Sequence, residues 1–262
     1  MKTLFEGTSE YYAQYRPSYP DKMFSDIVDK FHLDGRGRLL DIGCGPGVLT
    51  VPLSKYFEEV IAVDIDSGMI KKGKRMAKEA GIQNIKWINK SADDLDDTIG
   101  SFKLITFGAS FHWINREKFA NLANIILLDD GGIVVAWTGY SIWKKQRNIW
   151  KNKVLEIIKK YLGEERRAGN GLYTEPPGKH EDILKKAGFK NIEYLKYPSA
   201  VQIISSQDII KQQYTTSYAA KKLFGNKAAN FEKELIQELL KINPEDKFKE
   251  THVSGAIFAR KN

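Results

Sequence analysis

The feature that most constrains the fold of this chain is a strand-like run that ends in three alternate glycines. Leu39–Ile42 leads into Gly43, Gly45 and Gly47, and helix-period apolar residues follow directly. Glycine permits the tight turn between a buried strand and a helix, and without a Cβ it lets a ligand approach the backbone. The N–H groups at the start of the helix would then face that ligand. The sequence therefore predicts a strand, a ligand-binding turn and a helix.

The alternation of strand and helix patterns continues along the chain, which is typical of βαβ units and a parallel sheet. Strands are expected at 38–42, 59–64, 84–88, 102–108, 132–138, 191–197 and 252–260. Helical periodicity separates them at 48–56, 67–80, 116–128 and 179–187. The predicted fold is α/β, with a doubly wound, Rossmann-like sheet of seven mostly parallel strands.

Two segments do not follow this alternation. Residues 140–177 and 203–248 have mostly helical patterns, and each follows the carboxyl end of an expected strand. Ligands of open α/β sheets bind at the carboxyl ends of the strands, so we expect the two insertions to form a helical cap there. The predicted organisation is an N-terminal lid over 1–36 and a core of 37–139 and 178–262, with the two insertions as its cap.

Composition and charge limit the class of protein. With 262 residues, 42% of them hydrophobic and 28% charged, the chain can bury a sizeable core. It has no apolar stretch long enough to span a membrane and no secretory signal at its start, which predicts a cytoplasmic protein. The single cysteine, Cys44, gives neither a disulfide nor metal-ligand spacing, so we expect no metal site. The net charge of +8 is spread over lysine-rich helices, which indicates solvated faces rather than a nucleic-acid surface.

An acidic residue stands where a ribose-binding side chain is expected. Asp64 closes the second strand, and a carboxylate there can accept hydrogen bonds from a ribose diol. A nicotinamide-dependent dehydrogenase would satisfy the same expectation. Its G-x-G-x-x-G fingerprint, begun at Gly43, would require a glycine where this chain has Val48, so the spacing disfavours that alternative.

The D-x-G-x-G-x-G loop and the acid after it resemble the class I S-adenosylmethionine-dependent methyltransferases. In that family the loop cradles the amino-acid part of the cofactor and the acid holds the ribose hydroxyls. The resemblance therefore implies that S-adenosylmethionine is the cofactor. It assigns the corresponding contacts to Asp41, Gly43, Gly45, Gly47 and Asp64.

Two further segments extend this resemblance. The stretch from Asp64 to Met69 is similar to the family's D-x-S-x-x-M, displaced by one residue, which implies cofactor contacts for Ile65 and Met69. The stretch 91–95 looks like the family's loop after the third strand. There, an acid meets the adenine amino group and the preceding backbone meets the ring, which implies roles for Asp93 and Ala92. The alternative for Asp93 is an exposed acidic turn.

The end of the fourth strand is similar to the A-x-H-W segment of small-molecule methyltransferases such as the trans-aconitate group. This resemblance places Ser110 at the cofactor and Trp113 on the substrate side. His112 is the candidate general base, because it follows the fourth strand at the expected crevice edge. The alternative is that His112 only shapes the pocket.

The N-terminal stretch 5–20 is similar to the F-x-x-x-A-x-x-Y-x-x-x-R-P-x-Y-P opening of the same group, which folds over the cofactor. The resemblance implies that Tyr15 and Arg16 reach the cofactor carboxylate, and a planar guanidinium is well suited to bind one. Tyr12, and Tyr218 in the second insertion, are expected on the substrate side. The alternatives are a surface ion pair for Arg16 and packing roles for the tyrosines.

The function implied is methyl transfer to a small molecule, with a carboxylic acid as the leading candidate and phenols, quinones and amines still open. We expect no membrane partner. One alternative is a non-catalytic S-adenosylmethionine-binding sensor or assembly protein. An RNA methyltransferase is a further alternative, although the sequence has no appended RNA-binding module.

Overall fold

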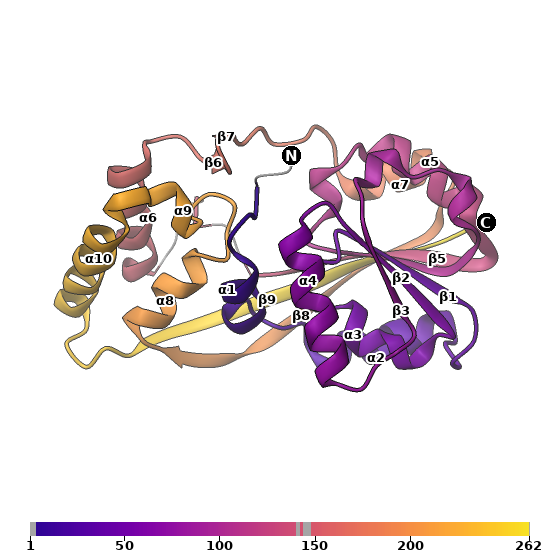
Figure 1. Ribbon diagram of the computed structural model, residues 1–262, viewed down its shortest axis with the longest axis horizontal. Coiled ribbons are helices and arrows are strands. Elements are labelled where there is room, and N and C mark those ends of the chain that lie inside the picture. The colour runs from indigo at the N-terminus through magenta and orange to yellow at the C-terminus, as the bar shows by residue number, and fades with distance from the viewer. Residues whose placement is uncertain (1–3, 140–141, 144–147, 262) are drawn as a thin grey trace. The chain divides into compact units, whose positions relative to one another are not determined.

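The computed structural model describes residues 4–139, 142–143 and 148–261. Within them, seven strands form one sheet in the order β3-β2-β1-β4-β5-β9-β8 (Figure 1). The strands are β1 (Arg38–Ile42), β2 (Glu59–Asp64), β3 (Ile85–Asn89), β4 (Phe102–Gly108), β5 (Leu127–Thr138), β8 (Lys190–Ile204) and β9 (Phe248–Arg260). Strands β1 to β5 pair in parallel and β9 pairs antiparallel with β5. The predicted α/β sheet is therefore confirmed.

The chain divides into two compact units. The first, here called the sheet unit, consists of Ser18–Thr138, Pro176–Pro198 and Val253–Asn262. The second, here called the helical unit, consists of Met1–Pro17, Gly139–Glu175 and Ser199–His252.

Helices cover both faces of the strands in the sheet unit. They are α2 (Asp21–Phe31), α3 (Thr50–Leu53), α4 (Ser67–Glu79), α5 (Arg116–Ile126) and α7 (His180–Lys186), with short 3₁₀ turns at η1 (Ser54–Tyr56), η2 (Ala92–Asp94), η3 (Asp97–Ile99) and η4 (Phe111–Trp113). Leu40 of β1 belongs to a buried cluster with Phe119 of α5. The residue before it, Leu39, belongs to a different buried cluster with Phe31 of α2. Because successive strand residues point to opposite faces, this is the doubly wound arrangement that the sequence predicts.

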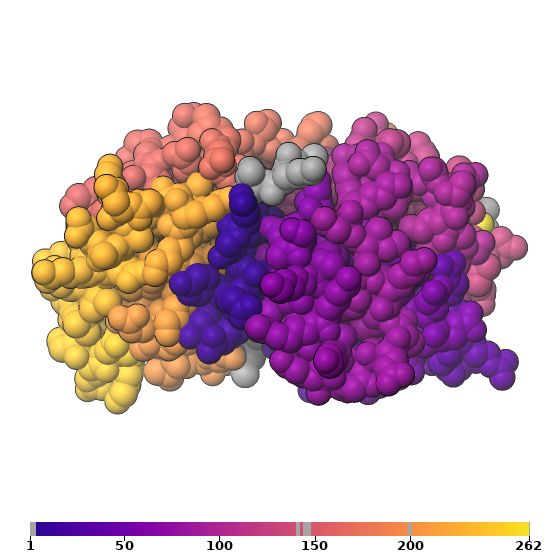
Figure 2. All heavy atoms as spheres, in the orientation of Figure 1, coloured from indigo at the N-terminus to yellow at the C-terminus, as the bar shows by residue number. Residues whose placement is uncertain are grey.

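Helix α4 is amphipathic, which explains its place on the sheet. Met69 and Ile70 are buried, whereas Lys71, Lys74 and Lys78 are exposed. In the space-filling view, α4 and its purple neighbours form part of the visible surface of the sheet unit (Figure 2). The lysines of this helix thus form the solvated face that the charge pattern indicates.

The helical unit has an apolar core of its own. Its elements are α1 (Ser9–Tyr15), α6 (Ile149–Leu162), the hairpin β6 (Arg167–Ala168) and β7 (Gly171–Leu172), α8 (Ser206–Gln213), α9 (Lys221–Phe224), η5 (Gly225–Lys227) and α10 (Ala228–Ile242). Phe224 and Phe231 stack with ring centroids 4.1 Å apart, and the buried ring of Tyr214 packs against both. Offset aromatic stacking of this kind adds to the apolar burial that stabilises the unit.

Several elements have other bounds than the sequence predicts. Strand β5 begins at Leu127 rather than at 132, and β8 continues to Ile204 rather than ending at 197. Within the predicted lid of 1–36, Met1–Pro17 belongs to the helical unit and residues 18–36 belong to the sheet unit. There, Met23, Ile27 and Phe31 bury one face of α2. Strand β9 begins at Phe248, four residues earlier than expected, and buried and exposed side chains alternate from Phe248 to Ser254. Glu250 is one of the buried residues at the start of β9, so a search for alternating apolar residues does not detect this part of the strand.

None of the helices among the described residues is both long enough and apolar enough to cross a membrane. In the same part of the chain, no group of three or more His, Cys, Asp or Glu side chains is arranged to hold a metal ion.

Candidate functional site

The glycine loop connects β1 to α3, and all three glycines have positive φ: +64° at Gly43, +54° at Gly45 and +89° at Gly47. A Cβ at Gly43 would lie 2.5 Å from the Ser110 Cβ, and one at Gly47 would lie 2.9 Å from the Trp87 ring. A Cβ at Gly45 would meet no atom within 4 Å. The outer glycines are therefore required by packing as well as by φ, whereas the backbone at Gly45 is open to an approaching group.

Asp41 lies beneath this loop and is 1% exposed. The Thr50 hydroxyl donates to its Oδ2 at 2.5 Å and the Thr106 hydroxyl donates to its Oδ1 at 2.8 Å. Burial raises the pKa of Asp41 to about 6, although both hydroxyl bonds act in the opposite direction. Both carboxyl oxygens thus tie β1 to α3 and β4. These contacts indicate that Asp41 supports the loop rather than contacting a ligand directly.

Asp64, at the carboxyl end of β2, holds the loop from the other side. The Gly45 N–H donates to its Oδ2 at 2.8 Å and the Asp66 N–H donates to its Oδ1 at 2.8 Å. Burial raises the pKa of this carboxyl, and the N–H bonds act in the opposite direction. A carboxylate has about four lone-pair sites, more than these backbone N–H groups use, so acceptor capacity remains for a bound group.

Asp66, two residues after Asp64, fixes the start of α4. It is the N-cap of α4, and its Oδ1 accepts hydrogen bonds from the N–H groups of Gly68 and Met69. Its Oδ2 is buried with no hydrogen-bond partner among the described residues. Met69 is buried in the first turn of α4, and Ile65 is half-buried between the two acids.

The end of β4 lies beside the loop because β4 pairs with β1, where Phe107 is opposite Ile42. Ala109 has φ +56°, a left-handed conformation that a residue with a Cβ seldom adopts. Ser110 follows and is 8% exposed, and its hydroxyl donates to the carbonyl of Ile42 at 2.5 Å. Ser110 thus fixes the β4 turn against the start of the glycine loop.

His112 and Trp113 lie in η4, directly after this turn. Their ring centroids are 4.7 Å apart, and both side chains are half-buried. The Trp113 N–H donates to the carbonyl of Ser110 at 2.9 Å. The two rings are therefore held at the sheet edge that carries the glycine loop and Asp64.

The loop after β3 carries Ala92 and Asp93, both half-buried in η2. The Asn115 N–H donates to the Asp93 Oδ1 at 3.0 Å, and Lys118 Nζ donates to the Asp93 carbonyl at 2.5 Å. Asp93 is thus bound to the start of α5 and is not a freely exposed turn. Its predicted contact with adenine stays a prediction.

The predicted residues of the helical unit lie on α1 and on the segment after α8. The Arg16 guanidinium lies 5.4 Å from the Tyr12 ring centroid. Lys211 of α8 lies 5.0 Å from the ring centroid of Tyr15. Tyr218 is 7% exposed, and burial raises the pKa of its phenol while the charges of Arg16 and Arg166 act against that shift. Tyr12, Arg16 and Tyr218 are therefore brought together, whereas Tyr15 packs on α8.

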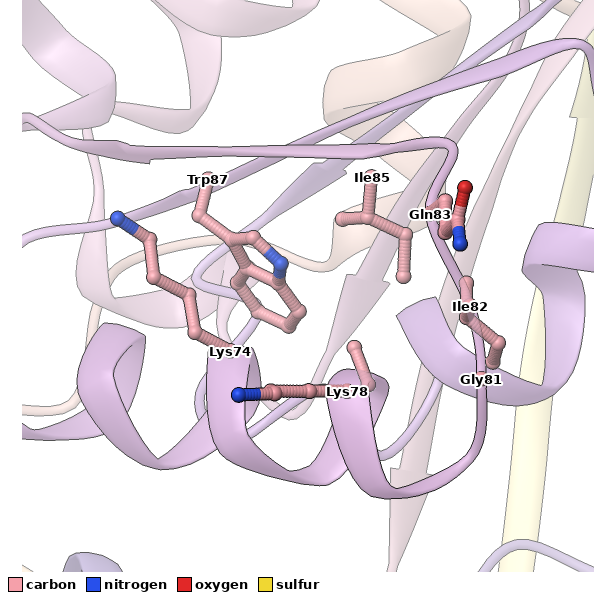
Figure 3. A pocket seen from close by; sticks show the side chains of 8 residues that line it. Lys74, Lys78, Gly81, Ile82, Gln83, Ile85 and Trp87 are labelled. Carbon is pink, nitrogen blue, oxygen red and sulfur yellow. The ribbon is translucent and has the colours of Figure 1, made fainter.

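Several residues of the site carry no signal that the sequence analysis uses. Thr50 and Thr106 hold Asp41 through hydroxyls that fit a helix start and a buried strand equally well. Trp87 of β3 limits the space at Gly47 and also lines a groove of about 430 Å³ beside α4 (Figure 3). The groove is lined by Lys74, Ala77, Lys78, Gly81, Ile82, Gln83, Ile85 and Trp87. None of these lining residues belongs to the predicted site.

The sheet edge suits S-adenosylmethionine on three observations. The backbone at Gly45 is open, Asp64 keeps lone pairs for hydroxyl groups, and Asp66 has a buried oxygen without a partner. An adenosine ribose and a charged amino-acid moiety need acceptors and N–H donors of this kind.

Known proteins resemble this chain in sequence and in fold. Residues 39–131 match the family described as "Methyltransferase domain". A Dictyostelium discoideum protein named as a methyltransferase is 31% identical over 188 residues, which cover 70% of this chain and 68% of that protein.

Two solved structures have the same fold. The YcgJ protein of Bacillus subtilis superposes with a TM-score of 0.59 at 17% identity, over 93% of this chain and 99% of that chain. A phosphoethanolamine N-methyltransferase 2 of Haemonchus contortus, in complex with phosphomonomethylethanolamine and S-adenosylhomocysteine, has a TM-score of 0.55 at 15% identity. That match covers 97% of this chain and 57% of the other.

The family match over residues 39–131 includes the glycine loop, the acid that ends β2 and the β4 turn. The match to the Dictyostelium discoideum protein spans more than two thirds of both proteins. Since these elements converge at one sheet edge in this structure, the similarity extends to the predicted cofactor site. The chain therefore belongs to the class I S-adenosylmethionine-dependent methyltransferases, and S-adenosylmethionine is its cofactor.

Proposed function

We propose that this enzyme methylates a carboxylate of a small molecule, as the trans-aconitate group does. The observation that carries the proposal is the surroundings of Tyr218 in the helical unit. Its phenol is buried, and the positive charges of Arg16 and Arg166 both act on it. A buried phenol beside guanidinium groups suits a small anionic molecule, because charge-assisted hydrogen bonds offset the cost of removing its charge from water.

We assign the cofactor to the sheet edge. Gly43, Gly45 and Gly47 would present backbone to its amino-acid part, and Asp64 would accept hydrogen bonds from its ribose hydroxyls. The adenine would lie among Ile65, Met69, Ala92 and Asp93. Bound S-adenosylmethionine supplies a methyl group that its sulfonium charge already activates, so the chain itself must mainly orient the acceptor and exclude water.

His112 has a limited task if the acceptor is a carboxylate. A carboxylic acid with a pKa near 4 is already ionised at neutral pH, so no proton has to be removed from it. We therefore assign His112 to orientation of the acceptor at the sheet edge, together with Trp113. A phenol or a protonated amine would instead need a general base, and His112 is our candidate for that role.

Incubation with methyl-labelled S-adenosylmethionine and a metabolite extract tests the proposal. We expect a labelled small molecule that releases labelled methanol in mild base, because a methyl ester hydrolyses under these conditions. A base-stable labelled product would contradict the carboxylate and point to an ether or an N-methyl group. Cofactor binding with no labelled product from any extract would favour the non-catalytic sensor.

A further inference from the structure

Arg166 lies at the start of the β6–β7 hairpin in the helical unit, where several contacts fix its position. Its guanidinium stacks on Tyr173, with Cζ 3.7 Å from the ring centroid, and lies 5.8 Å from the ring centroid of Tyr218. The Tyr173 N–H donates to the Arg166 carbonyl at 2.8 Å, and the Gly169 N–H donates to the carbonyl of Ser217 at 2.8 Å. The hairpin thus ties Arg166 to the segment that carries Tyr218.

The charge of a second arginine also acts on this phenol. Arg16 and Arg166 both act on the ionisation of Tyr218, which requires both guanidinium groups to lie within electrostatic range of its hydroxyl. The Nε atoms of both arginines are buried, and neither has a hydrogen-bond partner among the described residues. A buried charged donor that lacks a partner is costly unless an anion completes it.

Glu250 also lies near Tyr218, but it contacts other charged or titratable groups. Glu250 also acts on Tyr218, but its Oε2 lies 3.2 Å from His252 Nε2 and its Oε1 lies 4.0 Å from Lys151 Nζ. The two guanidinium groups that act on Tyr218 therefore outnumber this acid. The local charge therefore favours an added anion.

We infer that Arg166, together with Arg16 and Tyr218, binds a carboxylate group in the helical unit. A carboxylate can accept two parallel N–H bonds from a planar guanidinium fork, and stacking on Tyr173 keeps the fork in one plane. The group has two sources, the methyl acceptor and the amino-acid part of the cofactor. We assign Arg166 to the carboxylate of the acceptor, and this assignment rests on the proposed function. The inference that a carboxylate binds here does not depend on the proposed function.

Calorimetric titrations of the full chain test this inference with two probes. The first probe is S-adenosylhomocysteine alone, and the second is trans-aconitate added to protein saturated with S-adenosylhomocysteine. We expect Arg166→Gln to weaken trans-aconitate binding on the order of 10- to 100-fold and to leave the dissociation constant of S-adenosylhomocysteine within about twofold. Arg166→Lys should recover only part of the affinity, because an ammonium keeps the charge but loses the fork.

Arg36→Gln is the matched control, because it removes the same charge from a side chain that is 88% exposed in the sheet unit. It should change neither titration. If Arg166→Gln weakens S-adenosylhomocysteine binding instead, the carboxylate site stands, its ligand is the cofactor, and the assignment to a carboxylate acceptor falls. Two results would overturn the inference. One is that a folded Arg166→Gln variant has unchanged dissociation constants for both probes. The other is that the wild type does not bind trans-aconitate while Arg166→Gln binds S-adenosylhomocysteine normally.

Discussion

Gly45 and Asp64 are joined directly, since the Gly45 N–H donates to the Asp64 Oδ2 at 2.8 Å. The acid that ends β2 therefore fixes the part of the glycine loop whose backbone is open. The loop and the acid act as one unit, so a change in either should alter both loop geometry and cofactor affinity.

The glycines of the loop should respond differently to substitution. A Cβ at Gly43 would lie 2.5 Å from the Ser110 Cβ, so we expect Gly43→Ala to destabilise the fold by about 1 to 3 kcal/mol through strain and overpacking. Gly45→Ala meets no atom within 4 Å and should keep more stability while weakening S-adenosylhomocysteine binding. Chemical denaturation and calorimetric titration measure the two effects. Equal stability losses in both variants would contradict this division.

Asp41 should make the stability of the ligand-free protein depend on pH. Its folded pKa of about 6 lies above the ordinary value of 3.8, so its stabilising contribution is full below about pH 4 and is lost as pH rises through about 6. Relative to the wild type, Asp41→Asn should therefore gain up to roughly 3 kcal/mol between pH 4 and pH 7.5. Urea denaturation of both proteins across this range measures the difference. A difference that does not vary with pH would contradict the raised pKa.

The pH dependence of the reaction should show the role of His112. With a carboxylate acceptor, we expect the single-turnover rate to show no loss from about pH 8 to pH 6, and His112→Ala to change acceptor affinity more than rate. Rates of wild type and variant with the identified acceptor, in buffers of matched ionic strength, provide the measurement. A fall of the wild-type rate through an apparent pKa near 6.5, lost in the variant, would make His112 the general base.

The sheet could be predicted from the sequence because its strands and helices are short, regular and buried on fixed faces. Leu39 and Leu40, for example, point to opposite faces as the period of two requires. The early start of β9 could not be predicted, since its inward face carries Glu250 and His252 in place of apolar residues.

The candidate site was predictable only where a motif marks it. The glycines and Asp64 are found from their spacing, whereas the threonines that hold Asp41 are ordinary residues of a helix start and a strand. Arg166 is marked by no pattern, because its surroundings arise from a hairpin and from Tyr218, which is distant in sequence. Contacts between distant segments depend on the fold and cannot be read from local spacing.

The most direct test of the assigned cofactor site is calorimetric titration of S-adenosylhomocysteine into the wild type, Asp64→Ala and a control, Asp29→Ala. Asp29 is an exposed acid of α2, remote in sequence from the loop. Loss of hydrogen bonds to a charged acceptor should weaken binding on the order of 10- to 150-fold in Asp64→Ala only, and NAD should bind none of the three proteins. An unchanged dissociation constant in folded Asp64→Ala would contradict the placement of the cofactor at this sheet edge.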